Sequence, residues 1–290
     1  MTERLADINA RVDGVRQLGT VVNAMRGIAA ARSQQARKQL DAVDRYAATV
    51  AVAIGRALAL IDVKPSASPS TKPAVLLFCA EQGFAGAFSE RVLDEAAGGA
   101  ASASAAAAAD LAASTVFIIG SRGIAIGAAR GIDARWTAAM PSHSSGIPTL
   151  ADRVAEALYG LLAEGSVDRI EAVFSRWQPG HGVRVERRPL FPIELSTFES
   201  PLPLDKPVVN LPPAQLLAEL SAEHLHAQLC QVALHAFAAE NEARVEAMAA
   251  ARTEVERQLS DMQAMQRRVR QDEITAEIIE LAAGETASAR

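Results

Sequence analysis

Two glycine-rich stretches each follow an apolar run, the arrangement in which a loop can hold a phosphate. They are residues 83–86 (Gly-Phe-Ala-Gly) and residues 120–127 (Gly-Ser-Arg-Gly-Ile-Ala-Ile-Gly). Phosphate loops need either G-x-G-x-x-G or a loop that ends in G-K-[ST], and neither stretch has that spacing. Glycine also permits a tight turn from a strand into a helix. The turn is the favoured interpretation, and we expect no bound nucleotide or other cofactor.

The other side chains that could take part in catalysis or bind a metal form no recognisable site. His224 and His226 are two residues apart and would lie on different faces of a helix. Cys79 and Cys230 each have apolar neighbours, so we expect two buried free thiols. No Ser/His/Asp or Cys/His arrangement is evident. We therefore expect no catalytic residue and no metal site, with packed or solvated roles for the histidines: His143, His181, His224, His226 and His235.

Composition restricts the class of protein. The chain has 290 residues, with 29 basic and 34 acidic side chains, a net charge of −5. A general nucleic-acid binder normally has a basic excess. The 61 alanines and the aromatic content of only 4% favour long helices in close contact. No apolar run approaches the roughly 18 residues of a membrane span, and the N-terminus carries no signal-peptide pattern. We expect a soluble protein on the cytoplasmic side.

Both ends of the chain have the pattern of one very long helix. Residues 3–62 contain no proline, and apolar residues recur there at alternating spacings of three and four. After Pro213 there is again no proline, and the first glycine is Gly284, which suits a C-terminal cap. The predicted stripe of the first helix includes Leu5, Ile8, Val12, Val15, Leu18, Val22, Met25, Ala29 and Ala36, and that of the second includes Leu216, Leu220, Leu229, Val245, Val255, Val269, Ile278 and Leu281.

The middle of the chain has a different pattern. Short apolar runs alternate with helical stretches, which predicts a small α/β domain with a mostly parallel sheet. The tract 100–113 is nearly all Ala and Ser and is interpreted as helix without chemistry of its own. The predicted strands are 74–80, 115–120, 169–175 and an edge strand at 183–190, and the predicted helices are 89–95 and 150–163.

These parts define the predicted fold. Proline-rich linkers at 64–73 and 196–212 separate the middle domain from both helices. Because the chain leaves and re-enters one domain, the two helices should pair antiparallel and bury both stripes. The fold class is α/β: a long antiparallel coiled coil of the terminal helices plus a small, Rossmann-like α/β domain. The predicted boundaries are 1–62, 74–195 and 213–284, with the first and last segments in one coiled coil.

Short motifs at both ends and in the middle resemble one family. Residues 22–32 are similar to K-A-M-x-x-V-A-A-S-K of the F-type ATP synthase gamma subunit. Residues 238–248 (Ala-Ala-Glu-Asn-Glu-Ala-Arg-Val-Glu-Ala-Met) resemble its A-S-E-x-x-A-R-M-x-A-M, and residues 268–280 resemble N-K-A-R-Q-x-x-I-T-x-E-L-x-E. The loop at 81–88 is similar to D-R-G-L-C-G. The motifs occur in the family's order, and the two at the C-terminal end are the most specific.

The resemblance implies a function. The family's gamma subunit is the central rotor shaft of an F-type ATP synthase and couples ion flow through the membrane c-ring to nucleotide changes in the β subunits. Implied partners are the α and β subunits, the epsilon subunit and the c-ring. The implied location is the cytoplasmic side of the inner membrane, as a peripheral subunit. Nucleotide chemistry belongs to the β subunits.

The resemblance also implies contacts with the hexamer of α and β subunits. Arg270, Gln271 and Thr275 match positions that contact a catch loop of the β subunit, and Met25 matches a methionine that faces the β lever region. Arg26 and Arg244 are further implied contacts. Taken alone, polar residues on a helix are usually its solvated face, and Met25 would be core.

This sequence departs from the family pattern in three places. Asn23 and Thr20 replace basic residues, Glu81-Gln82 replaces the charge pair D-R, and Arg267-Arg268 replaces N-K. The departures favour a divergent branch, that of an alternative ion-translocating F-type ATPase, driven by protons or sodium ions. Two other classes stay open: an enzyme that binds a ligand in its α/β domain, and a coiled-coil scaffold or adaptor.

Overall fold

The computed structural model describes the chain except residues 1–4, 62–71, 99–110, 195–197, 199–208 and 289–290, and the side chains from 282 onward. The contacts divide the chain into two units, residues 29–244 (the central unit) and residues 1–28 with 245–290 (the terminal unit). Each unit is described separately. Two helices contribute to both: α1 (Leu5–Leu58) and α6 (Pro213–Ser288).

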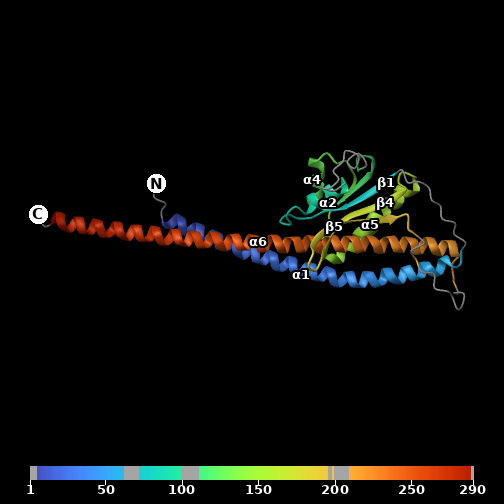
Figure 1. Cartoon of the computed structure of the whole chain (residues 1–290), viewed down its shortest axis with the longest axis horizontal. Helices are drawn as coiled ribbons and strands as arrows, with labels where there is room; N and C mark the ends of the chain where they lie inside the picture. Colours follow the sequence, from blue (N-terminus) through green and yellow to red (C-terminus); the bar gives the residue numbers. More distant parts are fainter. Residues whose placement is uncertain (1–4, 62–71, 99–110, 195–197, 199–208, 289–290) are drawn as a thin grey trace. The chain divides into compact units, whose positions relative to one another are not determined.

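The central unit contains a five-stranded mixed sheet (Figure 1). The strand order is β3-β2-β1-β4-β5, with all pairs parallel except β4 with β5. The predicted edge strand is confirmed as β5, as is the mostly parallel sheet. The strands are β1 (Pro73–Phe78), β2 (Thr115–Ile119), β3 (Ala134–Ala138), β4 (Arg169–Gln178) and β5 (Gly182–Phe191).

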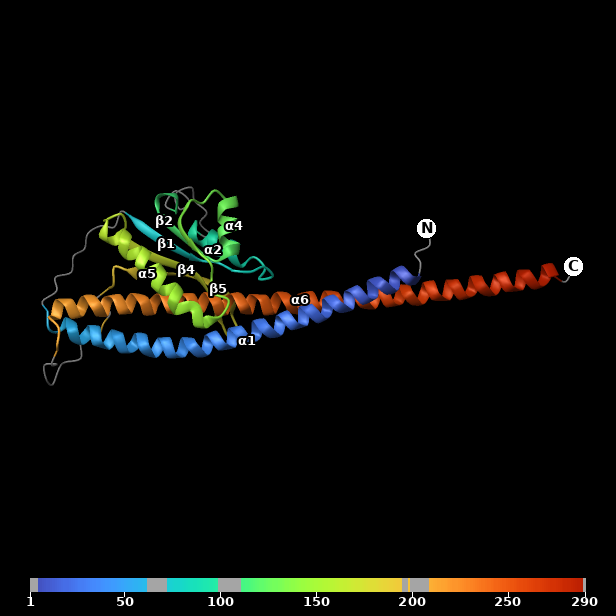
Figure 2. The same cartoon turned by 180° about the vertical axis from the view of Figure 1, so that it is seen from behind.

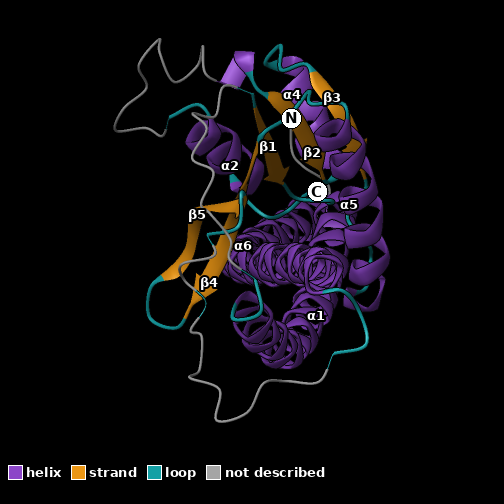
Figure 3. Ribbon diagram, turned by 90° about the vertical axis from the view of Figure 1, so that its right-hand side faces the viewer, coloured by secondary structure: helices purple, strands orange, loops and turns teal. Residues whose placement is uncertain are grey.

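Helices cover both faces of this sheet (Figures 2 and 3). The side chains of β1 alternate between two cores, because successive residues of a strand point to opposite faces. Leu76 and Phe78 join the core beneath α5 and α6, whereas Val75 and Leu77 join the core beneath α2 and α4. The helices of the sheet region are α2 (Phe88–Ala96), α4 (Ser121–Ala129), the short η1 (Ser144–Gly146) and α5 (Ile147–Ala163).

Two elements were not predicted, and one prediction cannot be compared. The strand β3 and the short helix η1 are absent from the sequence-based expectation, which placed a strand-to-helix turn at residue 120 but gave no range for α4. Most of the Ala/Ser tract 100–113 lies outside the described residues, and only 111–113 are seen, as helix. The predicted domain boundaries remain a prediction.

Helices α1 and α6 run antiparallel within each unit. In the central unit Gln231 donates a hydrogen bond to Asp44 at 2.7 Å, and in the terminal unit Gln266 bonds to Asn9. The helices bury many aliphatic residues of the predicted stripes, including Ile8, Val12, Val22, Ala29, Ala36, Ile54, Leu229 and Val255. The antiparallel coiled coil is therefore confirmed.

One predicted stripe position on α1 was wrong. Leu18 was placed in the buried stripe, but it is 50% exposed. The neighbouring Gly19, which is half-buried, faces α6 instead, and an added Cβ there would lie 3.2 Å from Val255 Cγ1. A glycine at this point lets the two helices approach closely, and a hydrophobicity pattern gives glycine no weight.

Candidate functional site: exposed faces of the terminal unit and a polar cluster of the central unit

The end of α6 is an exposed helical surface in the terminal unit. Arg270, Gln271 and Thr275 lie there, all exposed, and the Thr275 hydroxyl donates to the Gln271 carbonyl at 2.8 Å. This bond uses the backbone carbonyl of Gln271 and does not involve its side-chain amide. The predicted polar patch therefore exists as one surface.

Large apolar side chains share this surface. The predicted stripe included Ile278 and Leu281 as buried residues, and that prediction was wrong: they are 61% and 72% exposed. The physical reason is the antiparallel register. Asn9 lies opposite Gln266 and the described part of α1 begins at Leu5, so the described residues of α1 do not reach this part of α6. Ile274 and Ile279 are exposed as well.

A second exposed face lies on α1 in the same unit. Met25 and Arg26 are half-buried, and Arg26 donates to Asn23 at 3.3 Å. Met25 continues an outward-facing apolar line at spacings of three and four. The exposed members of this line are Leu18, Val21 and Ile28. In the part of α1 that belongs to this unit, the charged residues after Asp13 are both basic: Arg16 and Arg26.

The two faces are separate patches. Met25 lies sixteen residues beyond Asn9 on α1, and Arg270 lies four beyond Gln266 in the opposite direction. Twenty residues of helix correspond to roughly 30 Å. The structure therefore does not bring Met25 and Arg270 together, and each patch would need its own partner surface.

Arg244 belongs to the central unit and is buried. Its Nη2 donates to Glu240 Oε1 at 2.5 Å, and its Nη1 donates to Asn241 Oδ1 at 3.2 Å. It also donates to the carbonyls of Gln82 and Gly83. With 5% of its surface exposed, Arg244 is not part of a solvated helix face.

Glu240 holds the same loop from the other side. Its carboxylate accepts hydrogen bonds from the backbone amides of Glu81 and Gln82, at 3.1 and 3.3 Å. The pair Glu240–Arg244 therefore attaches the loop after β1 to α6 through both donors and acceptors. Phe84, at the tip of this loop, has φ of +62° and is 67% exposed.

Glu81 explains the glycine-rich stretch at 120–127. Its carboxylate accepts from the Ser121 amide at 2.9 Å, the Ser121 hydroxyl at 2.6 Å and the Met140 amide at 2.8 Å. Ser121 is the first residue of α4, so an anionic side chain of the protein occupies the position where a helix N-terminus attracts phosphate.

The backbone conformation at Gly120, the first glycine of that stretch, requires glycine. Gly120 has φ of +108°, and a Cβ there would lie 2.4 Å from the Cys79 carbonyl oxygen. The prediction of a tight strand-to-helix turn is confirmed. Cys79 and Cys230 are free and buried, as predicted. Burial raises the pKa of each thiol to about 12, with nearby carboxylates adding to the effect.

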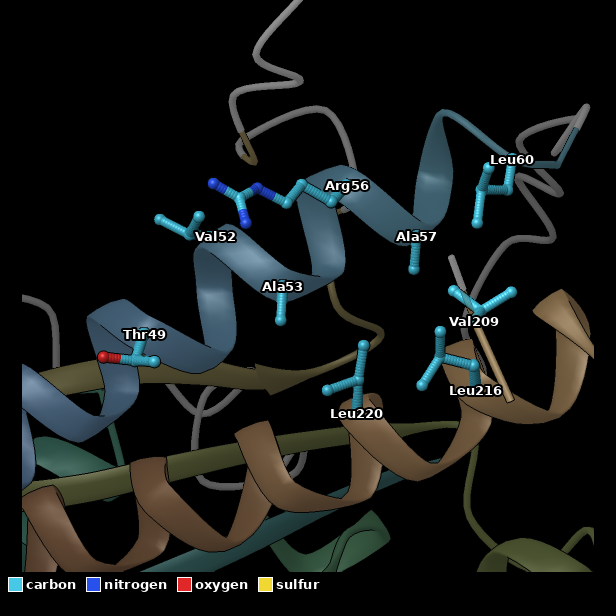
Figure 4. A pocket seen from close by; sticks show the side chains of 9 residues that line it. All are labelled: Thr49, Val52, Ala53, Arg56, Ala57, Leu60, Val209, Leu216 and Leu220. Carbon is cyan, nitrogen blue, oxygen red and sulfur yellow. The ribbon is translucent and has the colours of Figure 1, made fainter. Parts of the chain in front are cut away.

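Other chemically capable groups do not converge in the described part of the chain. No group of three His, Cys, Asp or Glu residues there could hold a metal ion. His226 contacts Asp152 at 3.0 Å. An open groove between the end of α1 and the start of α6 is almost wholly apolar, with Leu216 and Leu220 in its wall and Arg56 at its edge (Figure 4). Among the described residues, no helix is both long enough and apolar enough to span a bilayer.

Comparison with known proteins agrees with this architecture. A family model described as ATP synthase matches residues 4–287. The ATP synthase gamma chains of Chlorobium luteolum and Chlorobium limicola are 28% and 26% identical to this chain, and each alignment covers 97% of both sequences.

Solved structures share the fold. A chain of the Euglena gracilis mitochondrial ATP synthase, in an OSCP/F1/c-ring assembly, superposes with a TM-score of 0.67 at 14% identity, covering 98% of this chain and 94% of that one. A chain from the rotor of the same enzyme gives a TM-score of 0.59 at 14% identity, covering 93% and 98%.

Two long helices that flank an α/β sheet region thus define a central-stalk rotor subunit of an ATP synthase complex. The chain belongs to the ATP synthase gamma family. It is a peripheral component of a complex for ATP synthesis. The alternative of an unrelated adaptor with a ligand-binding domain is not favoured.

Sequence reasoning missed several residues of the site. Glu240, Glu81 and Glu242 were read only as parts of motifs, and Ser33 was not noted. Glu240 and Glu242 are carboxylates within an alanine-rich helix segment, and this was the one feature of the sequence that could have indicated a buried polar contact there. Their partners lie 159 and 209 residues away in the chain, a distance over which spacing carries no information.

Proposed function

We propose that this chain turns inside a hexamer of α and β subunits while its sheet region is bound to the epsilon subunit and the membrane c-ring. It would couple proton or sodium flow through the c-ring to nucleotide-state changes in the β subunits, on the cytoplasmic side of the inner membrane. The helices 1–62 and 213–284 would serve as the shaft, and residues 74–195 as the domain that meets the membrane ring.

The observation that carries this proposal is the exposed end of α6. Four large aliphatic side chains on one short stretch are unfavourable in water and mark an interaction surface. Subunits that surround a rotating helix must exclude water from the interface without binding the helix in only one orientation. Aliphatic side chains suit that requirement because their contacts are not directional.

The polar residues of this stretch suit a contact that is made and broken in each step. Arg270 supplies up to five donors in a planar fork, and Gln271 supplies both donors and acceptors. Thr275 fixes the turn by bonding back to Gln271. We assign these three residues to contact with the β subunits.

The face around Met25 is the second assigned contact. Its apolar line flanked by basic residues fits a partner segment that is both apolar and acidic. Arg26 belongs to this face. Arg244 is assigned differently: its hydrogen bonds are all internal, so we expect it to act on the hexamer by holding the 81–84 loop in place.

The first experiment is co-expression with candidate α and β subunits and purification through this chain. We expect one copy with three α and three β subunits, together with ATP hydrolysis. A chain that purifies alone as a stable dimer and ignores α and β would overturn the proposal in favour of an adaptor.

A pair of variants then tests the end of α6. The double variant Arg270→Ala, Gln271→Ala should assemble but hydrolyse ATP at least several-fold more slowly. The matched control is Arg267→Ala, Arg268→Ala, which removes two exposed cations from the preceding turn. Equal activity in both variants and the unaltered complex would contradict the assignment.

A further inference from the structure

A polar layer interrupts the buried stripe of α1 in the central unit. Ser33 is completely buried, between Ala29 and Ala36 in the line that faces α6. Its hydroxyl donates to Glu242 Oε1 at 2.7 Å. Arg37, one turn further on, places Nη1 3.2 Å from the same oxygen. Two groups of α1 thus converge on one carboxylate of α6.

Arg37 also connects this layer to the sheet. Its guanidinium lies 4.5 Å from the ring centroid of Trp177, a cation–π contact. Trp177 is on β4 and packs against the cluster that contains Ala239 and Ala243 of α6. The same side chain of α1 therefore contacts both α6 and the sheet.

The small side chains around this polar layer indicate why it would matter for the axial register of α1 against α6. The stripe around it is rich in small side chains: Ala29 and Ala36 are buried on α1, and Ala36 shares its buried cluster with Ala233 and Ala236 of α6. Alanine surfaces are nearly flat and would fit at several axial offsets with little difference in packing. A buried polar group that is satisfied at only one offset selects that register.

The opposite side of the same helical segment holds the loop after β1 through Glu240 and Arg244. The segment 240–244 of α6 is thus bonded to α1 on one side and to the sheet region on the other. The carboxylate of the first attachment is mostly buried, with Glu242 16% and its partner Arg37 40% exposed, and in the second attachment Arg244 and Glu240 are about as buried as core residues.

We propose that Ser33, Arg37 and Glu242 form a register lock, which fixes α1 against α6 and β4 so that the three elements turn as one body. These would be positioning residues for energy coupling, a role that rests on the rotor function proposed above. Without the lock, α1 can shift along α6 under load, and part of the torque is lost as slip between the helices.

The first test uses the isolated full-length chain and needs no partner. Glu242→Ala should accelerate amide hydrogen exchange of residues 30–37 about tenfold, because hydrogen bonds to charged groups stabilise more than neutral ones. Glu242→Gln keeps an acceptor for Ser33 but loses the charge that faces Arg37, so its effect should be smaller. The matched control is Gln231→Ala, which removes the exposed cross-helix bond to Asp44 and should leave residues 30–37 unchanged.

A double-variant comparison separates the lock from general loss of packing. Ser33→Ala combined with Glu242→Ala should accelerate exchange by clearly less than the product of the two single effects, because both remove the same interaction. Multiplicative effects, or unchanged exchange in Glu242→Ala, would overturn the lock.

The second test uses the assembled complex in inverted membrane vesicles. The ratio of ATP-driven ion pumping to ATP hydrolysis should fall at least twofold in Glu242→Ala and stay constant in Gln231→Ala. Faster exchange with an unchanged ratio would overturn the coupling role. If the unaltered chain does not assemble, the rotor function and the coupling role both fail, while the exchange measurements still decide whether the lock exists.

Discussion

Arg244 Nη2 lies 2.5 Å from Glu240 Oε1, one helical turn away on α6, and both side chains are almost completely buried. The carboxylate also accepts two backbone amides from the loop after β1. The pair connects α6 to a loop that lies about 160 residues away in the chain. Because both side chains are buried, little water is available to solvate either charge if the other is removed.

We therefore expect Arg244→Ala to lower the free energy of unfolding by about 3–5 kcal/mol, because it leaves a buried carboxylate without its counter-ion. The control is Arg252→Ala on the same helix. Arg252 makes an i,i+4 pair with Glu256 at 2.7 Å, but both partners are about half exposed, so its loss should cost less than about 1 kcal/mol. Urea denaturation of the full chain measures both values, and equal losses would contradict the importance of burial.

Glycines on α1 should reduce its stability. Gly14 and Gly27 lie in helix, and an added Cβ would meet nothing within 4 Å at either. Replacement of each by alanine should stabilise the helix by about 0.5–1 kcal/mol. Gly120→Ala is the opposing control: its φ of +108° and the close Cys79 carbonyl predict destabilisation. Thermal unfolding, monitored by circular dichroism, should show a higher melting temperature for the Gly14 and Gly27 variants and a lower one for Gly120→Ala.

His235 should make the protein less stable in mild acid. Burial first, and then the charges of Arg176 and Arg188, lower its pKa to about 4. The unfolded chain takes up this proton near the ordinary pKa of 6.5, well before the folded chain does. The stabilisation is therefore fully present above pH 6.5 and is lost as the pH falls toward 4, by up to about 3 kcal/mol.

The matching variant is His235→Phe, which keeps a ring to stack on Phe174, 6.0 Å away between centroids. It should flatten the pH dependence of unfolding between pH 6.5 and 4. An unchanged slope in this variant would assign the acid sensitivity to other groups.

Both thiols should be unreactive in the native protein. Cys79 and Cys230 are 1% and 4% exposed, and a pKa of about 12 leaves almost no thiolate at pH 8. Iodoacetamide should modify neither cysteine until denaturant is added, and then both, as counted by mass spectrometry. Rapid labelling of either cysteine in the native protein would contradict this prediction and would show that the core around that cysteine opens to solvent.

The long helices and most strands follow from local patterns. Apolar spacing and the absence of proline identify α1 and α6, and the apolar runs identify β1, β2 and β4, because each element buries a regular set of side chains. The strand β3 was missed because Ala134 to Ala138 alternates half-buried and exposed residues and includes Arg135. It is held by pairing with β2, which no local property reports.

The candidate site was less predictable. Arg270, Gln271 and Thr275 are exposed on α6, but the contact with a partner that the family resemblance implies for them is still a prediction. The apolar residues beside them were expected to be buried, because a stripe on one helix does not say where its partner ends. Ser33 was overlooked because a hydroxyl in an apolar stripe has meaning only once Glu242 is known to face it.

Glu81 has a consequence for the environment in which this chain works. Its carboxylate already satisfies the first amide of α4 and offers a negative charge to anything that approaches. In the function proposed above, the chain turns beside subunits that hydrolyse nucleotides, where ATP, ADP and phosphate are abundant. Because the Glu81 carboxylate already accepts from the Ser121 amide, this helix end has its own anion and does not need a phosphate group in that position.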